Sequence, residues 1–183
     1  MFIERNYLSV FGTDYSNGDT YTKIRIYDIS NKSKPFLART FKVAGRYTNG
    51  RKTEDGFVYL IANQQINRKY RPWYDYGSGR QELLWSSIYR YPIIYSRPQL
   101  TNIVAFNLGN PTSSEKKIVS ICGESSEIMY MAERSIYLTS TNYDSQKGDT
   151  YTTIRKIFVR KNRITPFADG KISREQFHII YER

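Results

Sequence analysis

Short runs in which apolar and polar residues alternate dominate the chain. In one such run Ile24 and Ile26 fall on one face of an extended strand, and Lys23 and Arg25 fall on the other. A period of two residues indicates β-strands and differs from the apolar stripe of a helix. The pattern predicts strands at residues 7–13, 22–30, 57–62, 101–108, 117–122, 127–131, 135–141 and 152–160. The only helix that we expect is a single turn near residues 173–176.

An eight-residue segment occurs twice. Residues 18–25 read GDTYTKIR and residues 148–155 read GDTYTTIR, so that seven of the eight positions are identical. Each copy follows a strand-like run and a polar turn, which predicts a β-hairpin. A third hairpin fits residues 57–61 and 102–108, with a long connection over residues 63–100. Further extended stretches follow the three hairpins, at residues 36–52, 117–131 and 163–181.

Three repeats of four antiparallel strands predict an all-β fold made of β-propeller blades. Blades stack so that each buries the apolar face that a lone sheet leaves exposed. We expect a single propeller-like domain over residues 1–183, with blades at about 7–52, 57–131 and 135–183. Because a closed propeller needs about four to eight blades, three blades leave the ring incomplete. The predicted partners are therefore further blades or another copy of the chain, which would complete the ring.

Several short motifs carry a family resemblance because they occur in a fixed order. They are TKIRIYDIS at 22–30, PFLARTF at 35–41, GRY at 45–47 and GFVYL at 56–60. In this order the chain resembles the secreted β-propeller domain family that is distantly related to WD40 repeats. The resemblance implies an archaeal or bacterial protein that is exported or held at the cell surface, and it implies no assigned reaction. Family members are longer, with enough blades to close a ring.

The charge and composition favour a water-exposed surface that attracts anions. Lysine and arginine number 28 against 17 acidic residues in 183, which gives a formal net charge of +11. The basic residues are spread along the chain, which is typical of a solvated surface and less typical of a nucleic-acid-binding patch. No apolar run approaches the roughly 20 residues that cross a bilayer, so we expect no membrane span.

Candidate catalytic residues are few. The chain has one cysteine, Cys122, and one histidine, His178, which excludes an intramolecular disulfide and the usual zinc sites. Cys122 ends an apolar run and is interpreted as a buried, inert thiol, and His178 as a structural histidine. Glycine-rich nucleotide loops and a Gly-x-Ser-x-Gly elbow are absent from the sequence. We expect no catalytic residue and no cofactor; the alternative is an enzyme whose site forms only across a complete ring.

Two polar turns, at residues 14–19 and 142–149, carry oxygen ligands that calcium accepts. Neither turn has the Asp-x-Asp-x-Asp-Gly order followed by a distal glutamate. Hairpin geometry alone selects Asp, Asn and Gly at such tips. We therefore expect no metal.

One segment of the long connection, residues 68–80, interleaves cations with aromatic residues. Aromatic faces stack on sugar rings or bases, and guanidinium groups bind carboxylates or phosphates. This composition predicts a site for an acidic glycan or another anionic partner. The alternative is that a long loop needs aromatic residues only to pack onto the sheet below it. The candidate ligand-binding residues are Arg68, Lys69, Tyr70, Arg71, Trp73, Tyr74, Tyr76 and Arg80.

The sequence thus leaves two hypotheses for function. The first is a non-enzymatic propeller module, exported or at the cell surface, that binds or scaffolds through its loops. The second is a basic nucleic-acid-binding protein that uses residues 68–80. The first residues lack the basic and apolar stretches of a signal peptide, so the external location depends on the family resemblance, and the alternative location is cytoplasmic.

Overall fold

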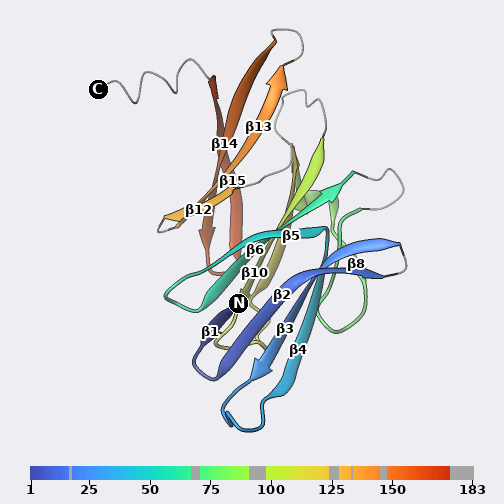
Figure 1. Ribbon diagram of the computed structural model, residues 1–183, viewed down its shortest axis with the longest axis vertical. Coiled ribbons are helices and arrows are strands. Elements are labelled where there is room, and N and C mark those ends of the chain that lie inside the picture. Colours follow the sequence, from blue (N-terminus) through green and yellow to red (C-terminus); the bar gives the residue numbers. More distant parts are fainter. Residues whose placement is uncertain are drawn as a thin grey trace.

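The computed structural model describes residues 1–16, 18–66, 71–90, 98–123, 128–132, 134–144 and 148–173, which form three sheets (Figure 1). The first sheet has the order β1 (Phe2–Glu4), β2 (Tyr7–Ser16), β3 (Asp19–Asp28), β4 (Phe36–Ala44), β7 (Trp73–Asp75), β8 (Gln81–Glu82). The second has the order β5 (Arg46–Lys52), β6 (Phe57–Gln65), β10 (Gln99–Asn107), β11 (Lys116–Gly123), β9 (Ile88–Arg90). The third has the order β12 (Ile128–Ala132), β13 (Ser135–Asp144), β14 (Asp149–Arg160), β15 (Arg163–Ser173).

Four antiparallel strands that neighbour one another in the sheet form the body of each sheet. The predicted hairpins are confirmed, including the pairing of β6 with β10 across the long connection. That connection is not a bare loop, because it contributes β7 and β8 to the first sheet and β9 to the second. β9 pairs with β11 in parallel, whereas the other strand pairs of the described residues are antiparallel. The single helical element in the described residues is the 3-10 turn η1 (Trp85–Ser87), and Ser173 of the expected helical turn ends β15.

The expected boundaries between the blades were wrong by one strand, because the last strand of each of the first two expected units belongs to the following sheet. β5 was expected in the first unit, 7–52, but it pairs with β6 of the second sheet. β12 was likewise expected in the second unit, 57–131, but it pairs with β13 of the third. The reason at the first boundary is Gly45, whose φ of 102° turns the chain from β4 directly into β5. A Cβ at Gly45 would lie 2.7 Å from the Asn63 carbonyl oxygen, so only glycine fits this crossing.

The two copies of the repeated octapeptide occupy equivalent places, as predicted. Gly18 and Gly148 lie in the turns of the β2–β3 and β13–β14 hairpins, with φ of 79° and 68°. The buried faces of the two copies are nevertheless opposite. Ile24 is buried and Arg25 exposed in β3, whereas Arg155, the counterpart of Arg25, is buried in β14. The two outer sheets therefore pack with opposite sides.

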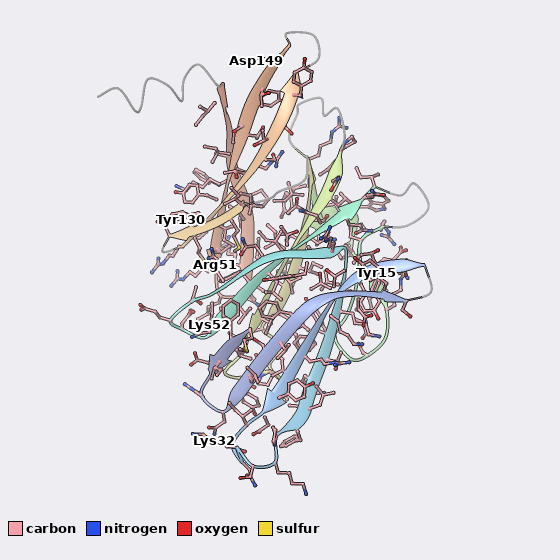
Figure 2. The ribbon with its side chains drawn as sticks, in the orientation of Figure 1. Tyr15, Lys32, Arg51, Lys52, Tyr130 and Asp149 are labelled. Carbon is pink, nitrogen blue, oxygen red and sulfur yellow. The ribbon has the colours of Figure 1, made fainter. Side chains whose placement is uncertain are left out.

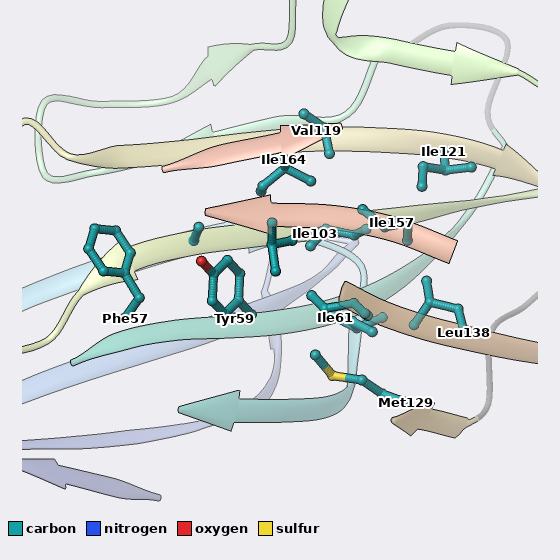
Figure 3. Close-up of a cluster of buried hydrophobic side chains, with 13 residues drawn as sticks. Phe57, Tyr59, Ile61, Ile103, Val119, Ile121, Met129, Leu138, Ile157 and Ile164 are labelled. Carbon is teal, nitrogen blue, oxygen red and sulfur yellow. The ribbon is translucent and has the colours of Figure 1, made fainter. Parts of the chain in front are cut away.

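The second sheet lies between the other two and is buried on both faces (Figure 1). Along β6, Val58 and Leu60 pack toward the first sheet, and Tyr59 and Ile61 pack toward the third. This explains why the second sheet reads as continuous apolar runs while the outer strand β3 alternates. Figure 3 shows the cluster in which Ile61 and Ile103 of the second sheet meet the third sheet.

Within the described residues the three sheets form an open stack, in line with the expected incomplete ring. The stack leaves one face of the first sheet and one face of the third without a neighbouring sheet among these residues. The search for apolar helices of membrane-spanning length found none in the part of the chain that is described.

Candidate functional site

The predicted binding segment is bound to the edge of the first sheet. β7 pairs with β4, and β8 pairs with β7, so residues 73–82 form a small hairpin that extends this sheet. The tip of the hairpin is ordered by the Asp75 carboxylate, which accepts the N–H groups of Gly77 at 2.7 Å and Gly79 at 3.1 Å. Both glycines have positive φ, at 98° and 97°, which explains the Gly-x-Gly spacing. Residues 73–82 are thus a fixed part of the sheet.

Two of the predicted aromatic residues pack inward. Trp73 is 6% exposed, and its ring lies 5.8 Å from that of Tyr21. Tyr76 packs edge-on against Phe41 at 5.3 Å, and burial raises the pKa of its phenol well above the usual value. The half-buried Tyr74 lies 4.9 Å from Tyr76, ring to ring. These aromatic residues pack onto the sheet below them, as the alternative interpretation of residues 68–80 predicted.

The two described arginines of the segment lie at its rim, and both are paired. Arg80 places its Cζ 4.5 Å from the Trp73 ring centroid, and its Nη1 lies 2.6 Å from the Asp19 carboxylate. Arg71 donates to the Glu82 carboxylate from Nε at 2.9 Å and lies 2.7 Å from it through Nη2. The hairpin therefore holds its guanidinium groups in defined positions instead of leaving them free to rotate.

The structure brings together Arg71, Trp73, Tyr74, Tyr76 and Arg80. The other three predicted residues, Arg68, Lys69 and Tyr70, lie outside the described residues. The binding role of the segment stays a prediction.

A tryptophan that did not figure among the predicted site residues is displayed to solvent close to Arg71. Trp85 opens η1 and is 73% exposed, and Leu84 beside it is also exposed. The Cζ atom of Arg71 lies 5.3 Å from the Trp85 ring centroid. The signal in the sequence was the apolar run Leu83-Leu84-Trp85 within a polar loop. One buried leucine, Leu83, is enough to anchor the chain, so Leu84 and Trp85 are left at the surface. Trp85 and Arg71 together form the candidate site.

The comparison with family models agrees with the three-sheet architecture. A family model described as "Beta propeller domain" matches residues 1–175. The chain belongs to the beta propeller domain family. The three sheets are accordingly propeller blades, and the candidate site lies on the insertion between β6 and β10. Comparison with curated proteins and with solved structures found no match.

The polar turn at the tip of the first blade pairs its carboxylates with cations, whereas in the third blade the Asp149 carboxylate accepts the Thr150 N–H at 2.7 Å. The Asp14 carboxylate accepts from Lys23 at 2.9 Å, and this hydrogen bond lowers the pKa of Asp14. Asp19 is paired with Arg80. Among the described residues no cluster of three or more His, Cys, Asp or Glu suitable for a metal was found, and Asn17 and residues 145–147 lie outside them.

His178 also lies outside the described residues, and Cys122 lies on β11 of the second blade. Its side chain is half-buried, and burial raises the pKa of the thiol despite the opposing charges of Arg90 and Arg155. A thiol with a raised pKa carries less nucleophilic thiolate at a given pH.

We expect Cys122 to react with iodoacetamide at least about fivefold more slowly in the folded chain than in the chain unfolded by denaturant, at the same mildly alkaline pH. Mass spectrometry of the alkylated chain over time measures both rates. A folded-state rate equal to or above the unfolded-state rate would contradict the interpretation of Cys122 as an inert thiol.

Proposed function

We propose that this propeller is a non-enzymatic binding module that holds an acidic glycan at Trp85 and Arg71 and works outside the cell or at its surface. The observation that carries the proposal is the exposed Trp85 indole with the Arg71 guanidinium over its ring. The external location is supported by the sequence resemblance to secreted propellers.

The two chemical groups match the two parts of an acidic sugar. An exposed indole offers a flat apolar surface on which the C–H face of a sugar ring packs. Arg71 engages Glu82 through Nε and Nη2, and its Nη1 makes no hydrogen bond to any described residue. Because a guanidinium has five N–H donors in one plane, Nη1 is able to donate to a uronate carboxylate while the pair with Glu82 is kept.

The site is also held rigidly by the chain around it. Leu83 is buried, and its N–H donates to the Pro72 carbonyl at 2.8 Å. The Ser87 N–H donates to the Leu84 carbonyl at 2.9 Å and closes the turn that carries Trp85. A side chain presented on a fixed turn loses less conformational freedom when a ligand binds. This supports a binding role over a merely exposed loop.

Replacing Trp85 with alanine should weaken the binding of polygalacturonate by at least about tenfold, because the stacking surface is removed. Arg71→Ala should weaken it as well, since the carboxylate loses its donor. Isothermal titration calorimetry against polygalacturonate, with neutral dextran as the reference ligand, measures the change. Both variants should keep the melting temperature within about 2 °C, because the two side chains lie at the surface.

The matched control is Tyr130→Ala, which removes an exposed aromatic residue from the third blade. Its affinity for polygalacturonate should equal that of the wild type. Unchanged binding in Trp85→Ala would overturn the proposal. Tighter binding of single-stranded DNA than of polygalacturonate, with a steep loss in salt, would replace it by the nucleic-acid hypothesis.

A further inference from the structure

A groove of about 910 Å³ lies between the second and third blades, away from the candidate glycan site. Its walls come from the end of β5 with the turn after it, from the turn between β12 and β13, and from the turn between β14 and β15. Figure 2 labels Arg51 and Lys52 on the second blade and Tyr130 on β12, the strand of the third blade that packs near β5. Residues 71–90 contribute nothing to the lining.

Positive charge dominates the described part of the lining. The cations are Arg51, Lys52, Arg134, Arg160 and Lys161. The opposing carboxylates are Glu54 and Asp55, and both belong to the turn of the second blade. Among the described residues, the charged groups that line the wall from the third blade are all cations, whereas the wall from the second blade carries charges of both signs. A recess lined mainly by one sign of charge concentrates its field on a bound counter-ion.

Most of these cations are not neutralised by a carboxylate of the described residues. Arg134, Arg160 and Lys161 are exposed, and their side chains form no ion pair or hydrogen bond with any described residue. Arg51 donates only to neutral acceptors, among them the Met129 carbonyl at 3.3 Å, and this bond fixes it across the boundary between the blades. Lys52 is the exception, because its Nζ lies 2.7 Å from the Glu4 carboxylate.

The floor of the groove is apolar and firmly packed. It includes Val159 and Tyr59, both buried, and the half-buried Met131. The Tyr59 hydroxyl donates to the Lys161 carbonyl at 2.8 Å, which ties the turn of the third blade to the second blade. The cationic turn is thus held in place over an apolar floor before any ligand arrives.

We propose that this groove binds a phosphorylated or sulfated sugar. The volume lies within the range of roughly 300–1,000 Å³ that is typical of small-molecule sites, which favours a small ligand over a polymer. Guanidinium groups bind tetrahedral oxyanions such as phosphate through paired, charge-assisted hydrogen bonds. Glu54 and Asp55 repel a second anionic group on their side but accept hydrogen bonds from hydroxyls. The ligand therefore carries its charge toward the third blade and its hydroxyls toward the turn of the second blade.

The test uses the full chain and isothermal titration calorimetry with glucose 6-phosphate, glucose 6-sulfate, inorganic phosphate and glucose. We expect at least one of the charged sugars to bind, glucose to give no signal, and inorganic phosphate to bind at least about fivefold more weakly than the charged sugar. The better of the two charged sugars identifies phosphate or sulfate as the preferred group. Inorganic phosphate binding as tightly as both sugars would overturn the sugar part of the proposal.

The double variant Arg134→Gln, Arg160→Gln should weaken charged-sugar binding by at least about tenfold, because the wall loses two cations that form no ion pair with a described residue. The matched control is Lys32→Gln, Lys34→Gln, which removes the same charge from exposed residues of the β3–β4 turn at the far end of the first blade (Figure 2). Equal losses in the two double variants would show a general effect of net charge and would overturn the groove site. Trp85→Ala should leave charged-sugar binding unchanged, so that the groove and the glycan site fail or succeed separately.

Discussion

Replacing Phe41 with alanine should lower the free energy of unfolding by about 3–5 kcal/mol, as is typical of a large buried aromatic side chain. Phe41 lies on β4 and is 1% exposed. Its ring meets Phe106 of the second blade at 5.7 Å and Tyr76 of the insertion at 5.3 Å, both edge-on. One deletion therefore leaves a cavity where two blades and the insertion between β6 and β10 meet. Equilibrium denaturation in urea measures the loss.

The control for this experiment lies on the same strand. Phe36 is 58% exposed, so Phe36→Ala should change the free energy of unfolding by no more than about 0.5 kcal/mol. The two variants remove the same atoms and differ only in the surroundings of the ring. Similar losses in both would contradict the packing of the first blade against the second.

Leu138→Ala should lower the free energy of unfolding by about 2–5 kcal/mol. Leu138 lies on β13 of the third blade, is 0% exposed, and belongs to the cluster shared with Ile61 and Ile121 of the second blade (Figure 3). Its loss removes apolar contacts and leaves a cavity at the boundary of the blades. Urea denaturation followed by circular dichroism measures the effect.

An aliphatic residue on the open side of the third blade provides the comparison. Ile128 is 63% exposed, so Ile128→Ala should stay within about 0.5 kcal/mol of the wild type. If Leu138→Ala were equally mild, the third blade would not be packed on the second as described. Comparing the losses in free energy of unfolding for Phe41→Ala and Leu138→Ala shows whether the boundary between the first and second blades contributes as much to stability as the boundary between the second and third.

The repeated blades could be predicted from the sequence because they depend on local patterns. Alternation in β3 and the turn glycines that begin the two octapeptides are sufficient to place the hairpins. The boundaries between blades were displaced because residues 36–52 form a nearly continuous extended run. A single residue, Gly45, separates β4 from β5 within it, and a lone glycine does not reveal that the chain has changed sheets.

The candidate sites were harder to predict because they depend on burial and on distant contacts. Trp73 and Trp85 look equally suited to stacking in the sequence, but the pairing of β7 with β4 buries the first and leaves the second exposed. The groove combines residues near positions 51, 134 and 160, which lie far apart in the chain. Only the packing of the third blade on the second brings these cations together.

The two copies of the octapeptide bury opposite sides, and this gives the stack of blades a direction. Among the described residues, the side of the first blade on which Arg25 lies has no neighbouring sheet, whereas in the third blade the side without one is that of Ile154, the counterpart of the buried Ile24. The two ends therefore differ in both shape and chemistry. A further blade of the same design that packs on the third blade must cover the Ile154 side with the side that corresponds to Arg25. Every blade then has the same orientation, so the stack extends head to tail.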